Sequence, residues 1–459
     1  MYQIDFQTPI HIHFIGIGGI SMSGLAELLL AKGFSVSGSD SKASALTDEL
    51  AKKGAVIHIG QCAENLTPSP ALVVYTAAIH EDNPEFTAAK EAGIPMLTRA
   101  ELLGQIMKCY PTPIAVSGTH GKTTTTSMIS SILLHADTDP TISIGGILKE
   151  NNSNFRIGHS DIFLTEACEY TNSFLSFFPR IGIILNVEED HMDFFHDIED
   201  IRNSFHRFAS LLPTDGVLII NRSIPGYEEL TRDLSCRIIT FGSDASCDFS
   251  YRALSYDEYG YPSYTLVRKD HAELPIGLHV PGEHNVLNSL AALALADVLG
   301  ISDETASQAL YDFSGTSRRF EYKGVLNGVT IIDDYAHHPT EITATLRAAA
   351  QYPHRRLWCI FQPHTYTRTK AFLNEFAQAL SLADHVILAD IYPARETDTL
   401  GISSKNLLEE LLALQVPCDQ PGDFSEIAAF VQENCINGDL LITMGAGDVV
   451  KIGEMLLKN

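Results

Sequence analysis

Three times along the chain, an apolar strand-like run ends in a glycine-rich turn that is followed by a helix-like stretch. These junctions are "HIHFIGIGG" at 11–19, "PIAVSGTHGKTTTT" at 113–126 and "DLLITMGAGD" at 439–448. Strands that alternate with helices in this way form parallel sheets with helices on their faces. The pattern therefore predicts an α/β protein, and other strand-like runs extend it. They lie at 35–40, 72–78, 94–99, 329–333, 357–362 and 385–391.

Two breaks divide this pattern into three parts. "CYPTP" at 109–113 is typical of a linker, and "FSGTSRRFEYKG" at 313–324 precedes a new set of strands. A length of 459 residues fits about three domains of ~150 residues each. We expect domains at 1–109, 110–317 and 318–459.

The composition excludes several classes of partner. With 31 basic and 57 acidic residues, the net charge of −26 disfavours nucleic acid and anionic lipid. No apolar run approaches the ~18 residues that span a bilayer, and no export signal is visible. The 8 cysteines include no C-x-x-C pair, which favours reduced thiols in the cytoplasm. An anionic small molecule must therefore be met by local cations, metal ions or helix N-termini.

The most specific stretch is "SGTHGKTTTT" in the middle junction. Backbone N–H groups of a glycine turn at a helix N-terminus cradle phosphates, and a lysine ammonium meets the terminal ones. Gly118, Gly121 and Lys122 supply these parts, and the Thr123 hydroxyl is placed to bind Mg²⁺. The spacing is shorter than the usual G-x-x-x-x-G-K-[ST]. The alternative is a threonine-rich helix cap, but the order of the parts favours ATP.

Acidic residues follow two further strand-like runs. Glu166 and Glu169 end "DIFLTEACEY", and Glu188, Asp190 and His191 follow "IGIILNV". Because ligands gather at the carboxyl ends of parallel strands, these groups are candidates to converge on the phosphate loop. Mg²⁺ prefers such oxygen ligands. The alternative for any single one is a solvated loop residue.

The first turn, "HFIGIGGISMSG", suggests a dinucleotide-binding fold but departs from its pattern. Gly16 and Gly18 supply G-x-G, whereas Ser21 stands where the third glycine of G-x-G-x-x-G belongs. Asp40 can bind the ribose of either NAD or a uridine nucleotide. An NAD-dependent oxidoreductase with an accessory ATP site, or a non-catalytic nucleotide sensor, therefore remains open from this turn alone.

Seven motifs in order make the chain resemble the Mur ligase family over almost its full length. They are "HFIGIGGISMSGLAELL", "SGSD", "SGTHGKTTTT", "NVEEDHMD", "PGEHNVLNSLAA", "DDYAHHPTEI" and "FQPHTYTRT". The resemblance implies a Rossmann-like UDP-binding domain, a central P-loop ATPase domain and a C-terminal Rossmann-like domain. It also implies an ATP-dependent amide ligase: ATP phosphorylates the lactyl carboxylate of UDP-N-acetylmuramate, and the amine of L-alanine attacks the acyl phosphate.

By the same resemblance, site residues carry over position by position. The nucleotide residues are Gly118, Thr119, His120, Gly121, Lys122, Thr123, Thr124, Asn285, Asn288, Arg319 and Asp334. The UDP-sugar residues are Gly16, Gly18, Gly19, Ser21, Asp40 and Thr76. The amino-acid residues are Tyr335, His337, His338 and Arg368. The metal-associated residues are Thr123, Glu166 and His191. The catalytic candidates are Lys122, His191, Arg319 and His338.

The chain departs from the family pattern at two of these motifs. Cys168 stands where the family often has the aspartate of E-A-D-E, and Thr365 stands where some members have an arginine. A ligase that attaches a whole murein tripeptide is the nearest alternative within the family. Its first motif generally resembles G-I-C-G-T, and it tends to have phenylalanine in place of Tyr335. The implied partners are small molecules, with Mg²⁺ as cofactor, and a monomer or weak homodimer is expected.

Overall fold

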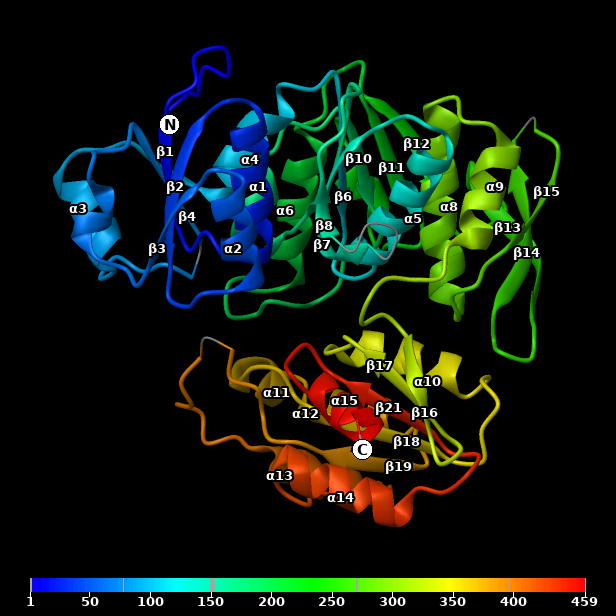
Figure 1. The fold of residues 1–459 in the computed structure, drawn as a ribbon. Helices are drawn as coiled ribbons and strands as arrows, with labels where there is room; N and C mark the ends of the chain where they lie inside the picture. The colour runs from blue at the N-terminus through cyan, green and yellow to red at the C-terminus, as the bar shows by residue number, and fades with distance from the viewer. Residues whose placement is uncertain (1, 77, 149–152, 270, 395, 459) are drawn as a thin grey trace.

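A computed structural model describes residues 2–76, 78–148, 153–269, 271–394 and 396–458 of the chain. Three sheets organise it into an N-terminal, a central and a C-terminal part (Figure 1). The N-terminal part (blue) lies beside the central part, and the C-terminal part (yellow to red) lies below in this view. The α/β architecture with mainly parallel sheets is confirmed. Among the described residues, no helix is both long and apolar enough to cross a membrane.

The N-terminal sheet is parallel and has the order β3-β2-β1-β4-β5. Its middle strand, β1, is buried from Ile12 to Ile15, as expected for a strand covered on both faces. The elements are β1 (His11–Ile15), α1 (Ile20–Ala31), β2 (Ser35–Asp40), α2 (Ala45–Lys52), β3 (Val56–Ile59), η1 (Ala63–Leu66), β4 (Leu72–Tyr75), α3 (Pro84–Glu91), β5 (Met96–Thr98) and α4 (Arg99–Met107).

The central sheet has the order β15-β14-β13-β12-β11-β10-β6-β9-β7-β8 and is parallel from β13 to β7. Helices α5 and α8 pack together, with apolar side chains of both in one buried cluster. The elements are β6 (Thr112–Ser117), α5 (Lys122–His135), β7 (Thr141–Leu148), β8 (Ser153–Arg156), β9 (Ile162–Ala167), η2 (Tyr170–Ser176), β10 (Ile181–Ile184), α6 (Ile198–Ala209), β11 (Val217–Asn221), α7 (Tyr227–Leu230), β12 (Arg237–Phe241), β13 (Phe249–Tyr256), β14 (Pro262–Arg268), β15 (Leu274–Gly277), α8 (Glu283–Val298) and α9 (Asp303–Asp312).

The C-terminal sheet has the order β16-β17-β21-β18-β19-β20, and only β16 runs antiparallel to its neighbour. The elements are β16 (Glu321–Leu326), β17 (Val329–Asp334), α10 (Pro339–Ala349), β18 (Leu357–Phe361), α11 (Tyr366–Ala371), α12 (Leu373–Leu380), β19 (His385–Leu388), α13 (Ser404–Ala413), β20 (Cys418–Asp419), α14 (Phe424–Asn434), β21 (Leu440–Met444) and α15 (Val450–Lys458).

Several expected segments have different bounds in the structure. The strand expected at 72–78 ends at Tyr75, and the one expected at 94–99 is only Met96–Thr98. Thr98 ends its strand because its side chain caps α4 through a capping box with Glu101. The expected linker at 109–113 is shorter than predicted, because its last two residues already belong to β6. Pro113 is tolerated because it is only the second residue of β6, close to the start of the strand.

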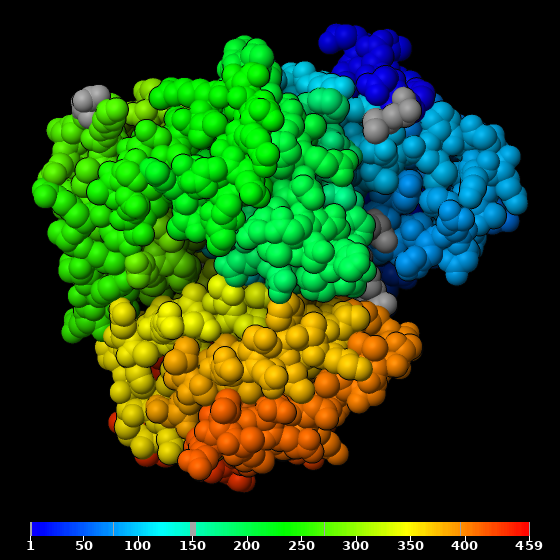
Figure 2. All heavy atoms as spheres, turned by 180° about the vertical axis from the view of Figure 1, so that it is seen from behind, coloured from blue at the N-terminus to red at the C-terminus, as the bar shows by residue number. Residues whose placement is uncertain are grey.

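Contacts between the parts bring distant segments together. Helix α4 packs against η2, where a Cβ on Gly104 would meet the Ser176 carbonyl. The C-terminal part presses against the central part (Figure 2). Thr340 of α10 donates a hydrogen bond to Glu188 at 2.7 Å, and Arg368 of α11 pairs with Asp190 at 2.8 Å. The carboxyl ends of the central strands therefore face the C-terminal part.

Candidate functional site

The phosphate loop connects β6 to α5 at the carboxyl edge of the central sheet. Gly118 and Gly121 have φ values of 144° and 82°, which favour glycine. Asn186, after β10, holds the loop by accepting from the His120 N–H at 2.7 Å and donating to its carbonyl at 3.0 Å. The loop is thus fixed in the shape that its glycines allow, with the N-terminus of α5 open toward a ligand.

Lys122, the first residue of α5, folds back over this loop. Its ammonium donates to the carbonyls of Gly118 and Thr119, and pairs with Glu169 at 2.9 Å. Burial lowers the pKa of Lys122, but the nearby acidic groups, Glu169 foremost, together outweigh burial and raise it. The ammonium therefore stays protonated and is available to a phosphate that displaces Glu169.

Two of the expected metal-associated residues lie together. The Thr123 hydroxyl donates to Glu166 at 3.1 Å, and Glu166 also accepts from the Gly145 N–H at 2.6 Å. Burial raises the pKa of Glu166. A hydroxyl and a buried carboxylate supply the hard oxygen atoms that Mg²⁺ prefers, so these residues fit that ion. A bound cation would also compensate the buried carboxylate.

His191, the third expected residue, lies on the other side of Lys122. Its Nε2 is 3.7 Å from Glu169 and 3.9 Å from Asp190, and its ring centroid lies 4.5 Å from that of Tyr170, with the two rings tilted by 31°. Burial lowers the pKa of His191, so the imidazole is neutral and keeps a lone pair. No hydrogen bond between the described atoms of His191 and Glu166 is present. Glu169 therefore joins His191 to the phosphate-binding lysine.

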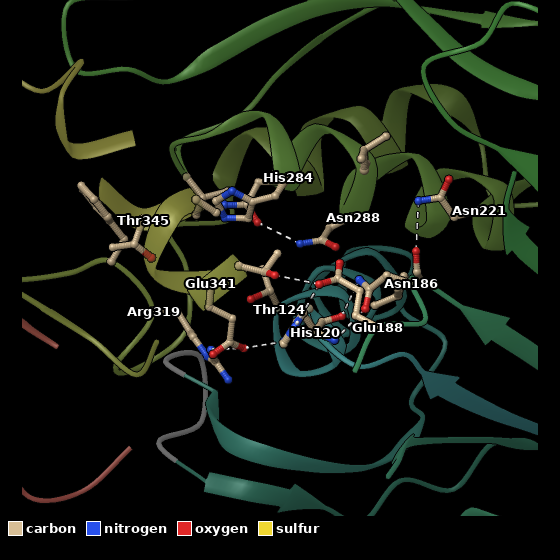
Figure 3. A pocket seen from close by; sticks show the side chains of 18 of the residues that line it. His120, Thr124, Asn186, Glu188, Asn221, His284, Asn288, Arg319, Glu341 and Thr345 are labelled. Carbon is tan, nitrogen blue, oxygen red and sulfur yellow. Dashed lines mark hydrogen bonds and ion pairs between the residues drawn. The ribbon is translucent and has the colours of Figure 1, made fainter. Parts of the chain in front are cut away.

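A cavity of ≈ 320 Å³ opens beside the phosphate loop (Figure 3). Asn285 and Asn288 at the start of α8 line it, as do Arg319 and Asp334. Asn288 donates to Asn285 at 3.1 Å. Both Asp334 oxygens accept backbone N–H groups, and burial raises the pKa of Asp334 to about 6. All the nucleotide residues expected outside the loop thus meet at one cavity.

Arg319 and Glu341 lie on the wall of this cavity that the C-terminal part supplies (Figure 3). Glu341 is 3.9 Å from Arg319 and 3.1 Å from His120 of the phosphate loop. Burial lowers the pKa of His120, but Glu341 and Glu188 outweigh it and raise the pKa to about 9. His120 therefore carries a positive charge at neutral pH, next to the expected phosphate site.

A second cavity, of ≈ 540 Å³, lies across the loop that follows β10. Tyr335, Arg368, Asp190 and His191 line it. Arg368, expected to hold the amino-acid carboxylate, donates through Nε and Nη2 to one oxygen of Asp190 at 3.1 and 2.8 Å. Thr365 caps α11 by accepting from the Arg368 N–H, so it serves the helix where some family members have an arginine.

The two adjacent histidines of "DDYAHHPTEI" lie in different surroundings. The Nδ1 atom of His337 is 3.1 Å from both Glu341 and the Tyr335 carbonyl, and its ring contacts His364. His338 is buried and caps α10, and its ring lies 4.7 Å from that of His120. Burial lowers the pKa of His338 to about 4. His338 thus lies at the domain interface and does not line the second cavity.

The residues expected to bind the UDP-sugar surround the first turn of the N-terminal sheet. Gly16 has a φ of 85°, and a Cβ on it would lie 3.8 Å from Thr76. Asp40 accepts from the Gly18 N–H at 2.9 Å, and a Cβ on Gly18 would clash with that carboxylate. Gly19 is the N-cap of α1, and Ser21 is in the first turn of that helix. The turn and Asp40 therefore form one unit.

Five further residues contribute to this site: Glu169, Asn186, Glu188, Asp190 and Glu341. Three of them, Glu169, Glu188 and Asp190, were expected near the phosphate loop, whereas Asn186 and Glu341 were not singled out from the sequence. All lie within the quoted motifs or directly before them, so motif membership was an available signal. Their partners come from other parts of the chain, and nothing in the local sequence indicates those pairings. "MGAGD" at 444–448 forms a structural turn, whose Gly445 carbonyl accepts from Arg318.

Family models match all three parts of the chain. The model described as "Mur ligase family, catalytic domain" matches residues 11–110. "Mur ligase middle domain" matches 116–296, and "Mur ligase, glutamate ligase domain" matches 318–447.

Similar proteins cover the full chain. UDP-N-acetylmuramate–L-alanine ligase of Lachnospira eligens is 61% identical over 459 residues, which is 100% of each chain. The crystal structure of UDP-N-acetylmuramate–alanine ligase from Thermotoga maritima has a TM-score of 0.81 and 29% identity, covering 98% of both chains. A murein peptide ligase from Psychrobacter arcticus follows, with a TM-score of 0.74 and 28% identity over 98% of both chains.

Proposed function

The chain belongs to the Mur ligase family, and we propose that it joins L-alanine to the lactyl carboxylate of UDP-N-acetylmuramate, with cleavage of ATP to ADP and phosphate. The full-length identity of 61% to an enzyme of that name supports alanine as the acceptor. Of the two solved structures, which have similar identities of 29% and 28%, the alanine ligase has the higher TM-score, 0.81 against 0.74 for the murein peptide ligase. The chain is thus a ligase of peptidoglycan precursor synthesis that acts on small molecules.

One structural observation carries this function: a single loop lines both cavities. Asn186 and Glu188 face the first cavity, and Asp190 and His191 face the second. ATP in the first and an amino acid in the second would therefore meet across this loop, beside Lys122. A ligase of this kind needs no protein nucleophile, because it acts by positioning its substrates and neutralising their charge.

Lys122 and His120 supply positive charge where the carboxylate and the γ-phosphate, both anions, must meet. Arg319 approaches the same cavity from the C-terminal part. Mg²⁺ would be held by Thr123 and Glu166, with His191 on the substrate side, and would polarise the phosphoryl group. Asn285, Asn288 and Asp334 would contact the nucleoside. Tyr335, His337 and Arg368 would surround the amino acid, with His338 closing the interface.

The first glycine turn is the proposed site of the UDP diphosphate. Its N–H groups lie at the start of α1, where a helix N-terminus favours anions. Asp40 is the candidate for the uridine ribose. This assignment leaves no turn for NAD, so it disfavours the oxidoreductase alternative.

The setting of the protein follows from the same properties. We propose that the chain acts in the cytoplasm as a monomer or weak homodimer, without nucleic-acid or membrane partners. Eight free cysteines and the acidic composition support this. The proposed domain boundaries are 1–109, 110–317 and 318–459, because the three sheets lie within these ranges.

The deciding experiment is phosphate release from ATP and Mg²⁺ with UDP-N-acetylmuramate and a panel of acceptors. The panel contains L-alanine, glycine, L-serine and the murein tripeptide. We expect L-alanine to give the highest kcat/KM. No turnover with any acceptor would contradict the ligase function, and turnover with the tripeptide alone would favour the alternative ligase. Lys122→Ala should abolish turnover and leave UDP-sugar binding intact; surviving activity would contradict the placement of ATP.

A further inference from the structure

The attacking amine raises a problem that the proposed function leaves open. A free amino acid carries an ammonium group at neutral pH, and an ammonium nitrogen has no lone pair with which to attack an acyl phosphate. Some group near the second cavity must therefore remove a proton. A general base works within hydrogen-bond reach of the proton that it removes, so the candidates are the imidazoles around this cavity.

His337 has the hydrogen-bonding pattern of an oriented base. Its Nδ1 lies 3.1 Å from a carboxylate oxygen of Glu341 and 3.1 Å from the Tyr335 carbonyl. Both partners are acceptors, so Nδ1 carries the hydrogen and Nε2 has the lone pair. Within the described part of the chain, Nε2 has no recorded hydrogen bond, and it is not among the buried unpartnered atoms. This is the arrangement by which a carboxylate orients a histidine base.

The neighbours of His337 place it beside the acceptor cavity. Its ring lies 5.7 Å from that of His364 and 5.4 Å from that of Tyr335, and both of those residues line the cavity. It also lies near enough to Asp190, which lines the cavity from the central part, to affect the pKa of that carboxyl. His337 does not itself line the cavity, but its side chain is 18% exposed beside residues that do.

The neighbouring imidazoles lack this combination. Nδ1 of His364 accepts from Arg368 at 3.2 Å. Nδ1 of His338 accepts from the Thr340 N–H at 3.4 Å, so its buried Nε2 carries the hydrogen. Nε2 of His191 faces Glu169 and Asp190 at 3.7 and 3.9 Å, on the phosphate side.

We propose that His337 is the general base that takes a proton from the ammonium of the incoming amino acid, with Glu341 as the residue that positions it. This assignment rests on the proposed ligase function. The N–H electron pair becomes the nitrogen lone pair, and the proton moves to Nε2. The nitrogen then bonds to the acyl carbon, the C–O bond to phosphate breaks, and the departing phosphate takes that electron pair. The second proton of the attacking amine leaves with the phosphate.

The role of His337 as the base can be tested by comparing an acceptor that must lose a proton before it attacks with one that need not. Hydroxylamine is uncharged at neutral pH, so it attacks an acyl phosphate without prior deprotonation and forms a hydroxamate. His337→Gln should lower kcat with L-alanine about 10²-fold or more, the usual range for general base catalysis. Hydroxamate formation from ATP and UDP-N-acetylmuramate should stay within a few-fold of wild type. An equal loss with both acceptors, or no loss with alanine, would overturn the proposal.

His354→Gln is the matched control. Its Nδ1 lies 2.6 Å from the carbonyl two residues earlier, Tyr352, just as His337 contacts Tyr335, but Tyr352 lines neither cavity, whereas Tyr335 lines the second. We expect this variant to keep both activities. Glu341→Gln should lower the alanine reaction more than the hydroxylamine reaction; equal losses would overturn its positioning role. If wild-type protein released no phosphate with alanine, the proposed function would fail instead.

A pH profile gives a second readout. In His337→Gln only solvent removes the proton, so log kcat/KM for alanine should rise with pH at a slope near one. The wild-type profile should level off above the range of an imidazole. The groups that face His337 are Glu341, Tyr335, His364, Asp190 and, through His364, Arg368. Parallel profiles for the two proteins would overturn the proposal.

Discussion

Arg368 directs both Nε and Nη2 to a single oxygen of Asp190, at 3.1 and 2.8 Å. Both residues are buried, and they come from the C-terminal and central parts. Burial raises the pKa of Asp190, but Arg368 and the nearby histidines together outweigh burial and hold it well below its usual range. The arginine expected to bind the substrate carboxylate therefore already has an anionic partner, which ties the two parts together.

Asp190→Ala should destabilise the protein strongly. Removing one partner of a buried ion pair leaves an uncompensated charge, which typically costs about 3–5 kcal/mol. Denaturant unfolding, followed by a signal from the C-terminal part, measures the change. Asp193→Ala is the control on the same loop, because Asp193 is exposed and accepts from the Tyr170 hydroxyl at 2.7 Å. Similar losses of unfolding free energy in both variants would show that the Arg368–Asp190 ion pair does not contribute specially to stability.

Gly118→Ala should weaken nucleotide binding. Its φ of 144° is unfavourable for alanine, and the new Cβ would lie 2.9 Å from the Leu185 Cβ and 3.2 Å from the Asn186 N. The phosphate loop must shift, so we expect ATP affinity to fall more than tenfold by calorimetry. Gly54→Ala separates strain from collision, because its φ is 103° and nothing lies within 4 Å of the added Cβ. That variant should bind ATP normally; equal binding in both would contradict the close fit of the loop.

Glu166→Gln should raise the Mg²⁺ concentration needed for half-maximal activity by tenfold or more. The substitution keeps the size of the side chain and removes the buried charge that a divalent cation would compensate. A titration of activity against Mg²⁺ measures this shift. Glu199→Gln, at an exposed position in α6, is the control and should leave the titration unchanged. An unaltered titration for Glu166→Gln would place the metal elsewhere.

His120→Gln should remove a pH-dependent part of the stability. The pKa of His120 is about 9 in the folded protein against 6.5 ordinarily, because Glu341 and Glu188 favour its charged form despite burial. A raised pKa stabilises the fold fully below pH 6.5, and this stability is lost as the pH rises through about 9. Its size is on the order of 1–3 kcal/mol.

Unfolding free energies at pH 6 and pH 10 measure this effect. The decrease between the two values should be smaller in His120→Gln than in wild type. Equal decreases in the two proteins would mean that the His120 imidazole does not carry a positive charge at neutral pH.

The elements around each glycine turn could be predicted from local sequence. Residues 113–126 contain the strand, the turn and the helix that the structure shows, because glycine tolerance, apolar runs and helix starts are local properties. Strand ends were less predictable. Tyr75 ends β4 three residues earlier than expected, and the apolar run "LVVYTAA" contains no signal for that end.

The site was predicted in part. Thr123 and Glu166 lie together as expected, since both stand at the carboxyl ends of neighbouring strands, β6 and β9. The expected member His191 instead lies between Glu169 and Asp190. Sequence motifs identify candidate site residues. They do not show which of the two cavities each residue of the loop faces.

The sequence alone determined the α/β class, the three glycine turns and the family, because these depend on residue type and spacing over short stretches. Only the tertiary structure decided the pairings across the parts: Arg368 with Asp190, and Glu341 with His120. These partners are separated by 178 and 221 residues along the chain. Their strength comes from burial, and burial exists only once the three sheets have packed.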